Sequence, residues 1–286
     1  MKWFNKVLYM AILNVTMPSN AMFKEPTEFV VIKIPDGVGL CDQMYFYALG
    51  TSIEKKGYPV KYHVPCCESE RFQLLKAFPY LNFKMVTTTE ANRHRCFVVS
   101  HLENYETCLN CRPPSYIRKT CCHDRLIDYS KYFSFKENIL DDVNLKILQK
   151  IRSLICPIGV HVRRGDMASP QGYIFVPPVD YFVKATRKAK ELFPDAYFFF
   201  FSDEPNYVKQ NILLQLDANI KYEAVDVNDF SKGYMDMFLM SECKHQIRSQ
   251  GSMGEMSYIL NKYSQKKLIA PKKCRKDVTV TPDFEI

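Results

Sequence analysis

The sequence lacks several features that would assign it to a common class of repeat, membrane-spanning or nucleic-acid-binding protein. It has no internal repeat and no low-complexity tract. Beyond residue 21, no segment is long and apolar enough to span a bilayer. It has no zinc-finger or helix-turn-helix signature, and its basic residues are not interleaved with stacking aromatics. Nucleic acid is therefore not expected as a partner.

The composition is that of a soluble globular protein with an excess of positive charge. The 286 residues are 47% hydrophobic and 24% charged, which is enough to bury a large core. The net charge of +8 favours an anionic partner such as a nucleotide diphosphate or an anionic lipid surface. Lysine and arginine are concentrated in residues 262–276. A solvated basic tail is the simplest interpretation, and peripheral contact with a membrane is the alternative.

Cysteine is abundant and unevenly distributed. Of the eleven cysteines, eight precede residue 123. Cys108, Cys111, Cys121 and Cys122, followed by His123, have some of the character of a metal site, but their spacing does not match a standard zinc motif. The sequence leaves open a structural zinc ion, a cluster of disulfides and reduced packing thiols.

Residues 1–26 form a predicted N-terminal extension. They contain lysines, an apolar run over residues 7–15 and the small-x-small triplet Ser19-Asn20-Ala21, which is the outline of a signal peptide. The apolar run is too short to span a bilayer. We expect a cytoplasmic protein, peripheral to the membrane at most. The alternative is a secretory or Golgi location if the extension acts as a signal or an anchor.

A first domain is predicted over residues 27–152. Residues 29–34 are a β-branched strand, and a turn with two glycines leads from it into a helix, with Asp42 placed to cap the helix. A strand, a glycine turn and a helix amino terminus together can bind an anion or a sugar. Residues 60–64 and 96–100 are predicted to be further strands.

Two later stretches complete this first domain. Periodicity disappears over residues 103–125, where Cys, Pro and Asn dominate, and this predicts an irregular excursion near an acceptor site. Residues 135–155 have the apolar spacing of an amphipathic helix that leads into the second half. We place the domain boundary near residue 153.

The second domain, residues 153–286, alternates strands and helices. Its element at residues 196–201 is an aromatic run too continuous for an exposed edge, so it is predicted to be a buried parallel strand. Repeated βα units imply a parallel, doubly wound, Rossmann-like sheet. The predicted strands are 158–163, 196–201, 220–225, 245–249 and 267–270, and the predicted helices are 180–193, 207–216, 234–243 and 254–261.

Polar residues follow three of these predicted strands. The first group is His161, Arg163, Arg164 and Asp166 within HVRRGD; the second is SDE, residues 202–204; the third is RSQGSMG, residues 248–254. Ligands of open α/β sheets bind at the carboxyl ends of the strands. Guanidinium groups suit a diphosphate, carboxylates suit ribose hydroxyls or guanine N–H groups, and backbone N–H groups of a glycine-containing turn can hold phosphates. Surface ion pairs and simple helix caps are the alternatives.

These motifs resemble a known family. HVRRGD, FFFFSDE (residues 198–204) and the segment from Asp236 to Leu260 resemble the donor-domain motifs of the α-1,2-fucosyltransferases of glycosyltransferase family 11. GLCDQMYFYALG, residues 39–50, resembles the GLGNQMFQYA segment of that family. The sequence departs from the family by Cys41-Asp42 in place of Gly-Asn, and by RSQGSMGE in the third motif.

The resemblance implies a GT-B architecture, with two Rossmann-like domains facing across a cleft. It also implies an inverting, metal-independent transfer of L-fucose from GDP-β-L-fucose, without a cofactor, to the 2-hydroxyl of a galactose-terminated oligosaccharide or glycolipid. Asp166, Arg164 and His161 would then be the catalytic residues, with Asp166 contacting fucose or activating the acceptor hydroxyl. The donor-binding residues would be Arg163, Arg164, Asp203, Asp236, Ser249, Gln250, Gly251, Ser252, Gly39, Asp42 and Gln43.

Two alternative functions stay open at this point. One is a fucosyltransferase of the same HxRRGD type with another linkage or acceptor. The other is a non-catalytic relative that binds a nucleotide or glycan without turnover, which the altered third motif motivates. The absence of a D-x-D triplet, common in metal-dependent transferases, agrees with a reaction in which arginines hold the diphosphate.

Overall fold

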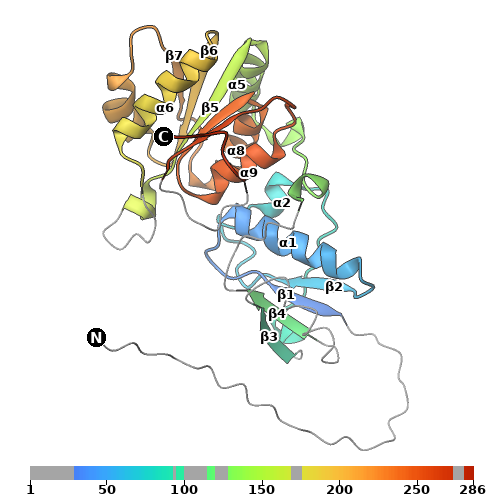
Figure 1. Cartoon of the computed structure of the whole chain (residues 1–286). Helices are drawn as coiled ribbons and strands as arrows, with labels where there is room; N and C mark the ends of the chain where they lie inside the picture. The colour runs from blue at the N-terminus through green and yellow to red at the C-terminus, as the bar shows by residue number, and fades with distance from the viewer. Residues whose placement is uncertain (1–28, 93–94, 100–114, 120–127, 169–175, 273–279) are drawn as a thin grey trace, which may run out of the picture.

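Two parallel β-sheets, each with helices packed on it, make up the molecule (Figure 1). The computed structural model describes residues 29–92, 95–99, 115–119, 128–168, 176–272 and 280–286. The first sheet has the strand order β2-β1-β4-β3, and the second has the order β10-β9-β8-β5-β6-β7. The strands are β1 (Val30–Lys33), β2 (Val60–His63), β3 (Arg95–Val99), β4 (Ser115–Lys119), β5 (Cys156–Val162), β6 (Ala196–Ser202), β7 (Lys221–Val225), β8 (His245–Arg248), β9 (Leu268–Ala270) and β10 (Phe284–Glu285). The predicted α/β fold with two Rossmann-like domains of GT-B type is confirmed.

The helices of the second domain follow the predicted order closely, and the helix predicted over residues 135–155 is shorter than predicted. The helices are α1 (Leu40–Glu54), α2 (Leu74–Ala77), α3 (Thr88–Ala91), α5 (Asp142–Ser153), α6 (Val179–Leu192), α7 (Pro205–Tyr207), α8 (Gly233–Glu242) and α9 (Ser252–Leu260). The predicted helix over residues 207–216 is instead the short α7 followed by one π-helical and one 3₁₀ segment, η5 (Val208–Ile212) and η6 (Leu213–Gln215).

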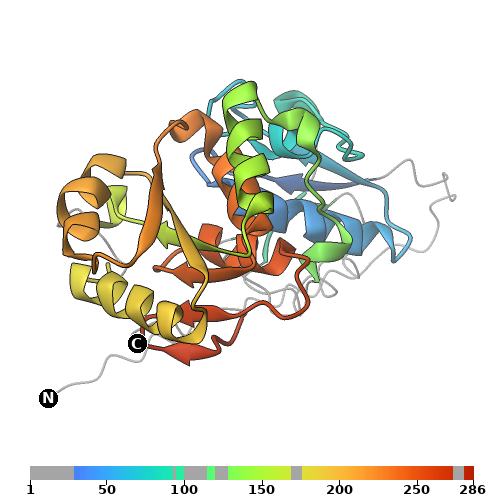
Figure 2. The ribbon, with the colours of Figure 1, turned by 90° about the horizontal axis from the view of Figure 1, so that it is seen from above.

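The second sheet has the strand order of a dinucleotide-binding fold. Counted along the chain from β5, its order is 3-2-1-4-5-6. Helix α6 covers one face, and α5 and α8 cover the other (Figure 2). The aromatic run of β6 shows why both faces are buried: Phe198 and Phe200 pack in the cluster with α6, whereas Phe199 and Phe201 pack in the cluster with α5 and α8. The prediction of a buried parallel strand is confirmed.

The prediction of an irregular excursion over residues 103–125 is wrong for part of its length. Residues 115–119 form β4, which pairs in parallel with both β1 and β3 and so lies inside the first sheet. Five residues with two positive charges, SYIRK, carry too little apolar alternation to be read as a strand. Backbone hydrogen bonds to the two flanking strands stabilise β4, although its local sequence pattern does not indicate a strand.

Two helix starts also differ from the predictions. The helix predicted from residue 135 begins at Asp142, because the Asp141 side chain accepts a hydrogen bond from the Asn144 N–H and caps α5 there. Asp42 does not cap α1. Gly39 occupies the cap position with extended backbone, and Asp42 lies within the first turn, where its charge still favours the helix dipole.

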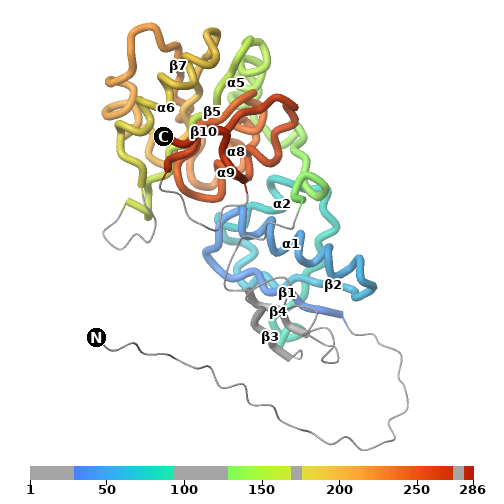
Figure 3. The backbone as a smooth tube through the Cα atoms, viewed as in Figure 1, coloured from blue at the N-terminus to red at the C-terminus, as the bar shows by residue number. Residues whose placement is uncertain are grey.

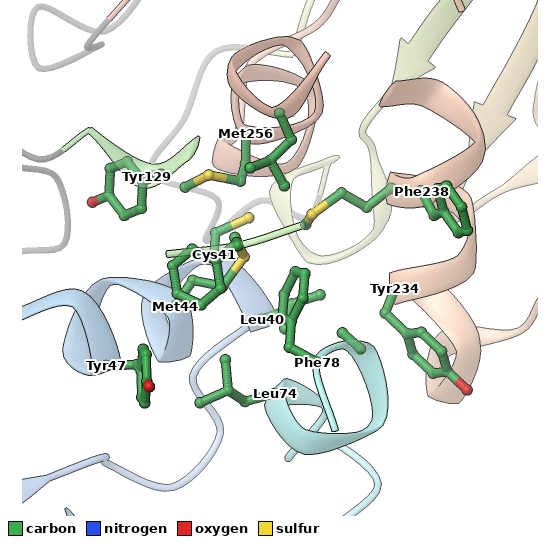
Figure 4. Packing of buried hydrophobic residues seen from close by; sticks show 14 of the residues in the cluster. Leu40, Cys41, Met44, Tyr47, Leu74, Phe78, Tyr129, Tyr234, Phe238 and Met256 are labelled. Carbon is green, nitrogen blue, oxygen red and sulfur yellow. The ribbon is translucent and has the colours of Figure 1, made fainter. Parts of the chain in front are cut away.

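The two domains share one apolar cluster. Helices α1 and α2 of the first domain lie against α9 and α8 of the second, as the tube in Figure 3 shows. Figure 4 shows Cys41 and Met44 of α1 directed toward Met256 of α9, with Leu74 and Phe78 of the α2 region packed in the same cluster. Most residues of α1 are buried because the helix has the first sheet on one side and the second domain on the other.

Some predictions concern residues outside the described part of the chain. These are the N-terminal extension and the cluster of Cys108, Cys111, Cys121 and Cys122. In the described part of the chain, Cys41, Cys66, Cys67, Cys156 and Cys243 are free thiols. No helix in the described part of the chain combines the length and the hydropathy needed to cross a membrane.

Candidate active site

The three predicted strand ends meet at one edge of the second sheet. Strands β5 and β8 are neighbours, and the connections after them leave in opposite directions, so the point between them is the topological switch point where ligands of such sheets bind. Arg163 and Arg164 follow β5, and Ser249 follows β8. Asp203 and Glu204 follow β6, the other neighbour of β5. The fold therefore brings HVRRGD, SDE and RSQGSMG together.

Arg163 is held by groups from all three motifs. Its backbone N–H donates to Ser249 Oγ at 2.8 Å. Its guanidinium forms ion pairs with Asp203 and with Asp166. The turn needs glycine at residue 165, where φ is +31° and an added Cβ would lie 2.4 Å from Asp203 Oδ2. The carboxylates keep the guanidinium at the strand end, directed by charge-assisted hydrogen bonds.

Arg164 points to the side of β6. Its backbone N–H donates to Asp203 Oδ1 at 3.0 Å, and its Nε donates to Glu204 Oε2 at 3.0 Å. Its guanidinium carbon lies 3.4 Å from the centroid of the Tyr207 ring. Sequence reasoning missed Tyr207, since nothing local marks it and only the fold brings α7 over the arginine. Asp203, predicted as a nucleoside contact, is bonded to both arginines.

His161 lies beneath this arrangement on β5. Its Nδ1 is 3.3 Å from Ser249 Oγ, and its ring packs so closely on Gly254 that a Cβ there would lie 2.7 Å from Nδ1. Burial, together with the positive charges of Arg163 and Arg248, lowers the pKa of His161 to about 3. The imidazole is therefore neutral at physiological pH, which suits a residue that shapes the site.

The amino terminus of α9 forms the third side of the candidate site, next to the ends of β5 and β6. Gly251, with φ +111°, is its cap residue and no side chain caps it, so the first-turn N–H groups face the switch point. Ser249 and Gln250 are buried beside it. Arg248 is buried with its Nη1 3.7 Å from Glu255 Oε2, and Glu255 Oε1 accepts the Val280 N–H at 2.9 Å. The pairing of Arg248 with Glu255 was also missed, because it joins a strand to the following helix.

The first domain approaches this site with the amino terminus of α1. The side chain of Cys41 lies next to that of Ser252 in the first turn of α9. Gly39 and Asp42 therefore lie at a helix amino terminus close to that of α9. Gln43, predicted to lie beside fucose, is buried with its side chain bonded to the backbone around it. Its partners are Val38 O, Arg71 O, Gln73 N and Leu74 N, at 2.6–3.0 Å.

Asp236 belongs to a different polar cluster. It is buried in the first turn of α8, where its Oδ1 accepts a hydrogen bond from Asn228 Nδ2 at 2.7 Å. Asn228 and Asn144 exchange side-chain hydrogen bonds of 2.8 and 2.9 Å, and Asn144 bonds Asp141. Burial raises the pKa of Asp236 to about 7. The cluster ties α5 and α8 to the loop after β7.

The site has the groups that bind a diphosphate. Two arginines, hydroxyls at residues 249 and 252, and the uncapped amino termini of α1 and α9 converge on the switch point. Arginine forks and helix N–H groups favour anionic oxygens over neutral ones. The carboxylates of Asp166, Asp203 and Glu204 pair with the two arginines and offset part of their positive charge.

One curated protein is similar to part of this sequence. The O-antigen biosynthesis glycosyltransferase WbnK of Escherichia coli is 29% identical over 149 residues, which cover 49% of this chain and 47% of that protein. The chain thus spans about half the length of this curated relative.

Two solved structures resemble the fold over most of the chain. POFUT1 in complex with GDP has a TM-score of 0.51 and 10% identity, covering 86% of this chain and 99% of the other. A mutant of Arabidopsis thaliana FUT1 in complex with GDP has a TM-score of 0.53 and 9% identity. The match covers 86% of this chain and 71% of the other. At these identities the likeness concerns the fold alone.

The profile of glycosyl transferase family 11 matches residues 116–279. That range is more than half of the 286 residues and includes all three motifs that meet at the switch point. The chain therefore belongs to glycosyltransferase family 11.

Proposed function

We propose that this protein transfers L-fucose from GDP-β-L-fucose to the 2-hydroxyl of a galactose-like glycan terminus. The observation that carries the proposal is the position of Arg163 and Arg164 at the switch point, beside the uncapped amino terminus of α9. A nucleotide diphosphate sugar is the donor that suits this set of groups. Membership of family 11 and the GDP bound to the two structurally similar proteins support the choice of donor.

The arginines would act on the leaving group. Negative charge accumulates on the β-phosphate as the bond between fucose and GDP breaks, and fixed guanidinium groups stabilise that charge without reorganising. Asp203 and Glu204 keep the two arginines in place through the bonds described above. The same charges can replace a metal ion, so we propose a metal-independent reaction.

Asp166 is our candidate for the base. Its side chain is 68% exposed, so the carboxylate can reach a substrate while its Oδ1 pairs with Arg163. A base there would remove the proton of the acceptor hydroxyl as that oxygen attacks the anomeric carbon from the face opposite GDP, which inverts its configuration. His161 does not suit this role, because it is buried and its ring is packed against Gly254.

The location of the protein and its contact with membranes are proposals as well. We propose a cytoplasmic protein with peripheral contact at an anionic membrane. The basic tail offers less free charge than its sequence indicates, because Lys267 pairs with Asp283 and Lys266 donates to the carbonyls of Tyr258 and Asn261. Lys262 and Lys272 are therefore the better candidates for that contact.

The first experiment measures GDP release from GDP-fucose with lactose as acceptor, with and without EDTA. Wild type should release GDP in the presence of lactose and resist EDTA, whereas Arg164→Ala should lose at least about a hundredfold in rate. Arg187→Ala is the matched control, because Arg187 also pairs with a carboxylate, Asp217, but lies on the distant face of α6.

Each result has a defined meaning. Failure of wild type to bind GDP would refute the donor assignment. GDP binding without release on any galactoside would favour the non-catalytic relative. Release with a product of another linkage would favour the fucosyltransferase of different specificity.

A further inference from the structure

Phe230 is an exposed aromatic side chain at the junction of the two domains. It lies in η7 (Phe230–Lys232), the short 3₁₀ segment between β7 and α8, and is 56% exposed. The guanidinium carbon of Arg71, from the first domain, lies 4.6 Å from the ring centroid. One face of the ring is therefore covered by a cation, and a large part of the side chain meets solvent.

The first domain fixes the position of Phe230. Its carbonyl oxygen accepts a hydrogen bond from Gln73 Nε2 at 2.8 Å, and Gln73 is itself buried. The backbone N–H groups of Gln73 and Leu74 both donate to Gln43 Oε1 at 3.0 Å. Gln43 belongs to α1, so the backbone of Phe230 is held by the helix that approaches the active site, and Arg71 covers one face of its ring. A ring that is already fixed loses little conformational entropy when a ligand packs on it.

The same contacts connect Phe230 to the rim of the site. Arg71 Nη1 donates to Gly37 O at 3.2 Å, in the loop that leads to the α1 cap residue Gly39. Two residues further, Cys41 lies next to Ser252 at the start of α9. The exposed ring, the glycine loop and the amino terminus of α9 are thus successive parts of one rim between the domains.

We propose that Phe230 and Arg71 form the subsite for the acceptor sugar. A galactose-like ring has an axial 4-hydroxyl, which leaves the hydrogens on C3, C4 and C5 together as an apolar patch on the opposite face. That patch packs on the exposed face of the Phe230 ring, and the N–H groups of Arg71 donate to hydroxyls at the edge of the sugar. The subsite rests on the proposed function and adds the residues that select the acceptor.

The test compares the steady-state kinetics of wild type, Phe230→Ala and Phe230→Tyr with lactose and GDP-fucose. Phe230→Ala should raise the KM for lactose about tenfold while the KM for GDP-fucose and the Kd for GDP stay within about twofold. Phe230→Tyr keeps the aromatic face and should restore the KM for lactose. Leu214→Ala is the control, because Leu214 is 79% exposed in η6, away from the rim.

The possible results separate the subsite from the proposed function. An unchanged KM for lactose in Phe230→Ala, with wild-type activity present, overturns the subsite alone. An equal loss of kcat and of GDP affinity also overturns it, because that pattern indicates that Phe230 only holds the domains together. Wild type that binds GDP but uses no galactoside overturns the subsite and the acceptor, and wild type that binds no GDP overturns the proposed function.

Discussion

The side chains of Cys41 and Ser252 lie next to each other at the junction of the two domains. Cys41 is in the first turn of α1 and Ser252 in the first turn of α9, so two helix amino termini lie beside each other. Both termini lack a side-chain cap, and their N–H groups are left for a ligand. The packing of the two domains therefore sets the positions of both helix amino termini in the candidate site.

Cys41 should be among the least reactive thiols of the native protein. It is buried, and burial raises its pKa to about 12, so the thiolate is scarce at any pH at which the protein is handled. Cys66 and Cys67 are exposed in the loop after β2 and should react first. Peptide-resolved mass spectrometry after timed alkylation measures the order of labelling.

Cys243 is the internal control for that experiment. It is buried in the second domain, away from the junction, and its pKa is also raised by burial. Fast labelling of Cys41 with slow labelling of Cys243 would show that the junction is open in solution, contrary to the packed cluster described here.

Gly254→Ala should destabilise the protein by about 1–3 kcal/mol, because overpacking forces neighbouring groups to move. The added Cβ would lie 2.7 Å from His161 Nδ1 and 3.1 Å from Arg248 Cβ. Gly233→Ala is the matched substitution in α8, where the nearest atom is the end of the flexible Gln73 side chain at 3.8 Å. It should leave the free energy of unfolding unchanged or raise it by about 0.5–1 kcal/mol. Urea titrations measure the free energy of unfolding of both variants. Equal changes in the two variants would contradict the close packing of His161 on Gly254.

Asp166→Asn should lower kcat for fucose transfer by about a hundredfold or more without weakening GDP binding. The substitution removes the proposed base, and it removes one of two carboxylates that compete with a diphosphate for Arg163. The measurement is kcat together with the Kd for GDP by calorimetry. A weaker Kd with unchanged kcat would assign Asp166 to holding Arg163 and would exclude it as the base.

The stability of the protein should fall as pH rises from about 4 to about 7 through the titration of Asp236. Its pKa is raised from 3.8 to about 7 by burial, so the folded state binds the proton more tightly than the unfolded state does. The stabilisation is complete below pH 4 and is lost as pH passes through 7, with a size of about 2–4 kcal/mol.

Asp236→Asn isolates this effect. The amide oxygen can still accept the hydrogen bond from Asn228, but it does not titrate. The difference in unfolding free energy between variant and wild type, measured by urea titration across this pH range, should increase with pH in favour of the variant. A difference that is constant with pH would show that Asp236 is not buried as a neutral carboxyl.

The sequence determined much of the second domain and its motifs. The spacing of HVRRGD, SDE and RSQGSMG after short apolar runs identified three strand ends, because a buried strand followed by polar residues is a local pattern. The phenylalanines of β6 indicated burial on both faces for the same reason. These features depend on neighbours along the chain, and the structure places them as predicted.

The tertiary structure decided what each polar residue does. Gln43 and Asp203 carry the side chains of typical ligand-binding residues, yet the first is bonded to the backbone of its own domain and the second to two arginines. Strand β4 exists because β1 and β3 pair with it, and Tyr207 meets Arg164 because α7 follows β6, the neighbour of β5. Hydrogen bonds and ring contacts of this kind join residues that are distant in sequence, so no local pattern encodes them.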